Sequence, residues 1–174
     1  MILDLVRLSL FPALMAFAAA SDLLTMTISN RVSLGLVAGF FLLALASGMG
    51  LHDLLSHAGA GAAVLAGAFV CFALGWLGGG DAKVAAAVAI WFGFDHLLAF
   101  LVYASLFGGA LTLLLLQLRQ WPLPSPLTGQ AWLLKLHDKQ SGIPYGIALA
   151  IGALMVYPET EWIKAVDPTH FAIH

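Results

Sequence analysis

Long apolar runs, broken only by short polar segments, dominate this chain of 174 residues. A helix needs about 20 predominantly apolar residues to cross a bilayer. Only 9% of the residues are charged, whereas soluble domains carry about 25%, so water cannot be the main solvent of the folded chain. In lipid, every backbone polar group must be bonded within the protein, which permits only helices or closed barrels. Continuous rather than alternating runs favour helices, so the sequence predicts an all-α, polytopic membrane helix bundle.

The lengths of the runs predict about six transmembrane helices. We expect one membrane-embedded domain over residues 1–158 and a short polar C-terminal tail over residues 159–174. Asp95 and His96 interrupt the fourth apolar region, so we expect a helix junction there, with a short span before it and a full span after it. The predicted spans cover residues 8–24, 32–51, 58–77, 78–94, 97–116 and 143–157.

A longer polar segment, residues 117–142, separates the last two predicted spans. Its three prolines oppose a continuous helix. After them, residues 131–140 read AWLLKLHDKQ, in which a tryptophan and several leucines alternate with charged side chains. That pattern suits a short helix lying on the membrane surface. A solvated loop is the alternative.

Basic residues are unevenly distributed between the two sides of the predicted bundle. Loops rich in Lys and Arg normally face the cytoplasm. If the spans alternate in direction, five basic residues lie on the side where the first span ends, and two lie opposite. The five are Arg31, Lys83, Arg119, Lys135 and Lys139, and the two are Arg7 and Lys164. We therefore expect a multi-pass protein of the cell (inner) membrane, with the five-residue side in the cytoplasm.

Two carboxylates fall on this same side, Asp22 at the end of the first span and Asp81 at the start of the fourth. An ionisable group in a membrane is costly and usually marks a functional site. Two carboxyl groups close together tend to share one proton. That arrangement suits aspartic proteolysis, because the ionised member accepts a proton from water while the protonated member polarises the scissile carbonyl. The simpler alternative is that Asp81 is a helix N-cap and Asp22 an interfacial residue.

Four further residues are candidates for supporting this pair or facing a substrate. Gly78 and Gly80 precede Asp81, and glycines there permit a positive φ or the close approach of another chain. Lys83 either stabilises a carboxylate or faces lipid headgroups. Asn30 either caps the second helix or forms a hydrogen bond near the aspartates. The sequence leaves these alternatives open.

Three segments, in order along the chain, resemble the type IV prepilin peptidase family, specifically its short form that serves Flp/Tad-type pili. The middle segment fits the family's glycine-x-glycine-aspartate-x-lysine pattern, and the last is similar to the start of the family's final helix. Where relatives usually have a proline in the first segment, this chain has Ser29. The segments are residues 19–23 (AASDL) with 28–30 (ISN), residues 78–83 (GGGDAK) and residues 143–148 (IPYGIA).

The resemblance implies a membrane aspartic endopeptidase that removes the leader peptide of type IV prepilins at the cytoplasmic membrane face. It implies that Asp22 and Asp81 are the catalytic pair. The implied partners are a prepilin leader peptide with its hydrophobic helix, and the lipid bilayer. The oligomeric state does not follow from it.

Other chemistries have less support in the sequence. A net charge of -2 without a basic patch speaks against nucleic-acid binding. The single cysteine, Cys71, excludes a disulfide framework or a four-cysteine zinc site within this chain, so we expect no cofactor and no metal. Longer members of the family that the chain resembles have a cysteine-rich cytoplasmic domain, and because this chain lacks those cysteines we expect no methyl transfer. His52, Asp53 and His57 cluster in a predicted outside loop, but three ligands in one short loop rarely complete a metal site.

The alternative function is that of a small membrane transporter, or of a structural subunit of a pilus secretion machine. A transporter would use Asp22 and Asp81 for ions or protons, and it would also need carboxylates within the membrane. Transporter sites usually lie near the bilayer midplane. Both aspartates here fall at one end of their predicted spans, which favours the peptidase.

Overall fold

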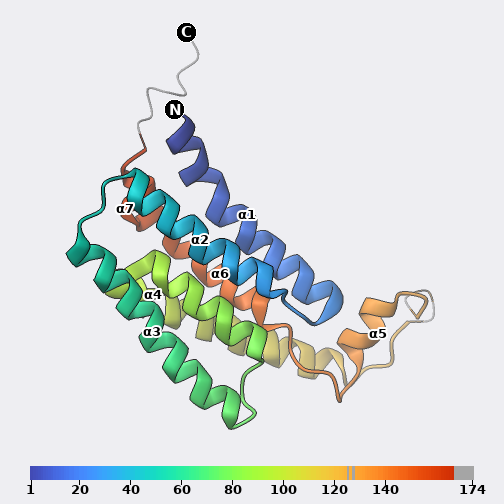
Figure 1. Ribbon diagram of the computed structural model, residues 1–174. Helices are drawn as coiled ribbons and strands as arrows, with labels where there is room; N and C mark the ends of the chain where they lie inside the picture. The colour runs from blue at the N-terminus through green and yellow to red at the C-terminus, as the bar shows by residue number, and fades with distance from the viewer. Residues whose placement is uncertain (125, 127, 167–174) are drawn as a thin grey trace.

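A computed structural model, which describes residues 1–124, 126 and 128–166, confirms an all-α membrane bundle. Its longer helices pack side by side and slant in the same direction across the molecule (Figure 1). Three of them are long and apolar enough to cross a bilayer, namely α1 (Ile2–Thr25), α3 (Leu51–Ala73) and α4 (Gly79–Leu118). Two shorter apolar helices, α2 (Asn30–Ala46) and α6 (Tyr145–Val156), complete the bundle.

The long element α4 consists of two helices joined at Gly93, whose backbone has φ 58° and ψ −173°. Only glycine adopts such a conformation without strain, so the break lies there rather than at the predicted junction, Asp95 and His96. The second half folds back along the first, and the rings of Phe92 and Phe100 meet at 5.4 Å across the turn. The bundle thus has six apolar helical segments, in agreement with the prediction.

Side chains satisfy two carbonyl groups in the turn before this break. In a regular helix these carbonyls would accept hydrogen bonds from the N–H groups four residues later. Instead His57 Nδ1 lies 2.7 Å from the Ile90 oxygen, and Trp162 Nε1 donates to the Trp91 oxygen at 2.9 Å. Since a carbonyl can only accept, the His57 nitrogen must carry the hydrogen. Both side chains therefore stabilise the chain reversal.

The structure changes two interpretations that were based on the sequence. The residues His52, Asp53 and His57 lie in the first turns of α3, not in a loop, because that helix already begins at Leu51. The predicted polar tail begins at residue 159, yet Trp162 is buried in the core on the short helix α7 (Glu161–Lys164), after the 3₁₀ turn η2 (Tyr157–Glu159). Residues 167–174 of that tail lie outside the described part of the chain.

The first half of α4 is the centre of the bundle. Its residues from Val84 to Ala89 are all buried, which means that neighbours cover every face of this segment. Alanine dominates there, and small side chains let neighbouring helices approach closely in a membrane. By contrast, α1 and α2 bury single helical stripes. The stripe of α1 comprises Asp4, Arg7, Phe11, Met15, Ala18 and Asp22.

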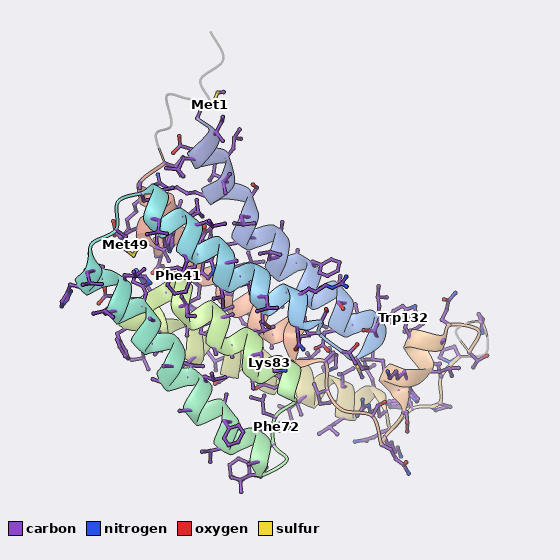
Figure 2. The ribbon with its side chains drawn as sticks, in the orientation of Figure 1. Met1, Phe41, Met49, Phe72, Lys83 and Trp132 are labelled. Atoms are coloured by element: carbon purple, nitrogen blue, oxygen red, sulfur yellow. The ribbon has the colours of Figure 1, made fainter. Side chains whose placement is uncertain are left out.

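A short helix, α5 (Ala131–His137), lies beside the end of α1. It matches the predicted surface helix over residues 131–140 but ends three residues earlier, and a solvated loop is wrong for this segment. Lys135 Nζ donates to the carbonyl of Thr25 at 2.7 Å, which ties α5 to the last turn of α1. In Figure 2, Lys83 and Trp132 lie toward this end, and Met1 and Met49 lie toward the opposite one.

Candidate active site

Asp22 and Asp81 lie at the same end of the bundle, as the topology predicted. Asp22 is in the last turn of α1 and continues the buried stripe of that helix, so its side chain points inward and is only 5% exposed. Asp81 is the third residue of α4, one helical turn from the start of the central segment. Both carboxylates line one cavity of about 540 Å³, and they are near enough to repel each other.

The Asp22 carboxylate is held by the start of α6. Its Oδ2 accepts a hydrogen bond from the backbone N–H of Gly146 at 2.7 Å. A Cβ atom at position 146 would lie 2.9 Å from that oxygen and 2.8 Å from Ile28 Cδ1. Both distances are shorter than real Cβ contacts, so only glycine permits this approach. The N-terminus of a helix also favours a nearby negative charge.

The Asp81 carboxylate is held by the start of its own helix. Gly78, not Asp81, is the N-cap of α4, and its backbone N–H donates to the Asp81 carboxylate. The alternative in which Asp81 is the N-cap is therefore wrong. A Cβ atom at position 78 would lie 2.8 Å from Asp81 Oδ2. The glycine thus gives the carboxylate access to the backbone, whereas its φ is −69° and needs no positive region.

The four supporting candidates lie in three different places. Gly78 lines the cavity with the aspartates. Gly80 instead packs on the connection between α1 and α2, where its Cβ position lies 3.5 Å from Ile28. Lys83 Nζ donates to Asn30 Oδ1 at 2.9 Å, and this pair faces a separate groove between α2, α3 and α4. Lys83 and Asn30 therefore join α4 to the start of α2.

Asn30 does not cap α2, because the N-cap is Ser29. The hydroxyl oxygen of Ser29 accepts a hydrogen bond from the Arg31 N–H at 3.3 Å. Ser29 has φ −64° and ψ 139°, which is close to the φ that proline fixes. The residue that departs from the family's pattern thus keeps a backbone that proline can adopt.

Two side chains that sequence reasoning did not select contribute to the site. Tyr145, the first residue of α6, lines the cavity and lies directly over Gly108, where any side chain would collide with its ring. Arg119, at the end of α4, is 6% exposed and donates to three carbonyl groups. These acceptors are the oxygens of Leu136, Ser141 and Gly142, at 2.9, 3.1 and 2.9 Å.

Arg119 thereby fixes the segment that enters α6. Gly142 and Ile143 line the cavity, and Gly146, which holds Asp22, follows directly. The family-like segment at residues 143–148 pointed to Tyr145 and Gly146. In the sequence, Arg119 is a single arginine at the end of an apolar run. An arginine that contacts lipid headgroups has the same position, so the pattern did not single it out.

The arrangement is suited to proton-transfer chemistry at one end of the bundle. Two carboxylates, each with one backbone N–H donor, face a common space with room for a peptide segment and water. Among the described residues, no Lys, Arg or His forms an ion pair with Asp22 or Asp81. Within the same residues no group of three His, Cys, Asp or Glu side chains could hold a metal ion.

A family model of type IV leader peptidases matches residues 9–113, more than half of the chain. The matched stretch contains Asp22, Asp81, Gly78, Gly80 and Lys83, and it ends before α5 and α6. No curated protein and no solved structure is significantly similar to the chain.

Proposed function

The chain belongs to the type IV leader peptidase family, and from that premise we propose that it is a membrane aspartic endopeptidase. Its proposed substrate is a type IV prepilin of the Flp type, from which it removes the leader peptide at the cytoplasmic membrane face. One observation carries the proposal. Asp22 and Asp81 come from different helices, far apart in the sequence, and they meet at a single cavity.

In the proposed reaction, one carboxylate is ionised and accepts a proton from a water molecule in the cavity. The water oxygen attacks the carbonyl carbon of the scissile peptide bond. The other carboxyl group donates its proton to the carbonyl oxygen and stabilises the tetrahedral intermediate. The C–N bond then breaks, and the leaving amine takes up the proton that the first carboxylate accepted. At the same time a hydroxyl group of the intermediate returns its proton to the second carboxylate, which leaves a carboxylic acid and restores both aspartates.

The place of the cavity suits this substrate. Asp22 lies near the end of α1 and Asp81 near the start of α4, so the reacting groups sit at one end of the bundle and not at its middle. A leader peptide is polar and its cleavage site adjoins an apolar helix. The scissile bond of such a chain lies at the membrane boundary. A transporter would place its carboxylates near the midplane.

Charge supports a cytoplasmic site. Lys83, Lys135 and Arg119 all contact segments at the aspartate end, whereas Arg7 contacts Ala165 at the opposite end. The basic residues therefore separate in space as the positive-inside rule expects for a cytoplasmic aspartate end. Accessibility labelling of a cysteine placed at Lys139, in a cysteine-free variant, tests the side. Labelling from the periplasm would contradict this orientation.

The catalytic assignment is tested by measuring how much full-length Flp-type prepilin the enzyme converts to the shorter form in membranes. We expect Asp22→Asn and Asp81→Asn each to lower processing by at least about 100-fold. The double variant should lose little more, since residues that act as one unit show non-additive effects. Asp95→Asn, at an exposed position, is the matched control and should process normally.

Asparagine keeps the shape and can hydrogen-bond, but it cannot accept a proton from water. A purely structural role would tolerate both substitutions. Near-normal processing by a well-expressed Asp81→Asn variant would therefore contradict the peptidase mechanism. It would favour the transporter or the structural subunit of a secretion machine.

A further inference from the structure

Helix α3 lies at one side of the bundle. It packs mainly against α4, and its C-terminal part extends away from the other helices (Figure 1). Much of its surface consists of exposed apolar side chains, including Phe69 and Phe72. Phe72 marks the free tip of this helix in Figure 2.

An apolar groove of about 490 Å³ runs between α3 and the two halves of α4, with α6 at its floor. Gly67 and Ala63 on α3 line it and are exposed, so the groove opens sideways to the lipid. Between Ala63 and Cys71 it follows α3 for about 12 Å, at 1.5 Å per residue. This length is more than one third of the hydrocarbon core of a bilayer, which is about 30 Å thick.

This groove is continuous with the cavity of the aspartates. Leu77, Asp81 and Tyr145 line both of them. Asp81 therefore stands where a polar cavity at the membrane boundary meets an apolar groove within the membrane. A chain whose scissile bond lay at Asp81 would have the cavity on one side of that bond and the groove on the other.

We propose that this groove receives the beginning of the substrate's apolar helix, just after the scissile bond. The helix enters from the lipid between α3 and the second half of α4, and the polar leader lies in the cavity beyond Asp81. The inference rests on the proposed function, because it places the apolar part of the same substrate. It predicts that recognition of a prepilin depends on α3 as well as on the aspartates.

The chemistry of the groove fits a helix better than it fits an extended peptide. Beyond its first turn, a helix has no free backbone N–H groups, whereas an extended peptide exposes N–H and C=O groups throughout, and the groove offers few polar partners. Its walls carry small side chains, such as Gly67, Ala68 and Ala104, which let a helix approach closely. The substrate helix is covalently linked to the peptide segment that lies at Asp81. A free lipid or a second copy of the chain has no such link.

The first test fills the groove. Gly67 lines the groove, and a Cβ atom there meets nothing within 4 Å, so Gly67→Leu adds bulk at the groove without a Cβ clash. Gly109 is the matched control, because it is also helical and unobstructed but does not line the groove. Two substrates are compared, a full-length prepilin and a soluble peptide that spans the scissile bond but carries only the first few residues after it.

We expect Gly67→Leu to lower kcat/KM for the full-length prepilin by about tenfold or more, mainly through KM, because overpacking an interface weakens it. The soluble peptide should be cut at the parent rate, and Gly109→Leu should not change either rate. Equal rates for Gly67→Leu and Gly109→Leu on the prepilin would overturn the inference. Failure of the parent to cut the prepilin would overturn the proposed function itself.

The second test uses Cys71, which lines the groove and is the single cysteine of the chain. In the inactive Asp81→Asn variant, a short thiol cross-linker should join Cys71 to single cysteines along one face of the substrate helix, spaced three or four residues apart. This readout does not depend on cleavage. Absence of cross-links, as lipid occupancy predicts, or cross-linking only between two enzyme copies would overturn the proposal.

Discussion

The two ends of this bundle both bury charged side chains, but they do so in opposite ways. At the end where α1 begins, Arg7 donates to Ala165 and Ser47 and lies 3.5 Å from Asp4. Tyr157 Oη in turn donates to the carbonyl of Arg7 at 2.7 Å. This end, which we call the Arg7 end, has opposite charges in contact and a cluster of aromatic rings beneath them.

At the other end, the acidic side chains Asp22 and Asp81 form no ion pair with a basic residue of the described chain. Their hydrogen-bond donors are the backbone N–H groups of Gly146 and Gly78, and both face a cavity. Backbone donors fix the carboxylates in place without neutralising them as a cation would. The paired charges at the Arg7 end therefore contribute to stability. The unpaired carboxylates at the aspartate end retain the capacity to exchange a proton.

The largest effect is expected at the Arg7 end. Arg7→Met removes the cation beside Asp4 and three side-chain hydrogen bonds. Breaking one partner of a buried ion pair costs about 3–5 kcal/mol. We expect the lower end of that range, because the N-terminal amine also pairs with Asp4 at 2.9 Å. Thermal unfolding in detergent measures the loss.

The matched variant at the aspartate end is Asp22→Asn, which should unfold within a few degrees of the parent. Arg7→Met should keep normal specific activity in its folded fraction. If Arg7→Met unfolded like the parent, or Asp22→Asn were the less stable of the two, the contrast between the ends would be wrong.

The second prediction concerns the position of Asp22. Gly146→Ala forces a methyl group against Asp22 and Ile28. A misplacement of about 1 Å can lower activity by about 100-fold, so we expect a decrease of between about tenfold and 100-fold in prepilin processing. Alanine is the better helix former, so a fall in helix propensity cannot explain the loss. Gly109→Ala, which meets no neighbour, is the control. Parental activity in Gly146→Ala would show that this contact does not position the carboxylate.

The third prediction concerns Arg119 as a positioning residue. Arg119→Lys keeps the charge but loses the planar fork that reaches three carbonyls. We expect kcat for prepilin cleavage to fall by up to about tenfold with little change in KM, because the groove is untouched. The exposed Arg31 allows a matched control, Arg31→Lys. A change in KM alone would indicate that Arg119 acts on binding and not on the aspartates.

The smallest effect is expected at Ser29. Ser29→Pro should raise the free energy of unfolding by about 0.4–1 kcal/mol, because proline restricts the unfolded chain. It should lower the same free energy by about 1 kcal/mol, because the serine cap is lost. The backbone at this position already has φ −64°. The two terms nearly cancel, so stability and processing should stay close to the parent values. Loss of folded protein on membrane extraction would show that the α1–α2 connection has another shape.

The sequence predicted six apolar helical segments because the length of a span is set by the thickness of the bilayer, which a sequence shows directly. It placed the reversal of α4 at the polar pair Asp95 and His96, although the chain turns at Gly93. Polarity was a poor guide here. The turn requires a backbone that only glycine adopts, and Asp95 remains exposed beside it.

The candidate site was predicted in part. Asp22 and Asp81 were selected because carboxylates at the ends of apolar spans are rare. Lys83 and Asn30 were grouped with them by proximity in the sequence, yet they bond to each other on a different face. Tyr145, Gly146 and Arg119 were not selected. The family-like segment at residues 143–148 contains Tyr145 and Gly146, but their contacts with other helices, like those of Arg119, are not recorded in a local pattern.

The sequence alone was enough to predict the apolar surroundings, the helical secondary structure and the end of the bundle at which Asp22 and Asp81 lie. These follow from local quantities, namely the apolar length of each run, the position of each charge within it and the balance of basic loops. It took the packed bundle to show that two carboxyl groups meet at one cavity, whereas Asp4 meets Arg7 at the other end. The partner of a carboxyl group depends on how helices pack, and that packing depends on glycines such as Gly146, whose hydrogen-bond acceptor lies 124 residues away.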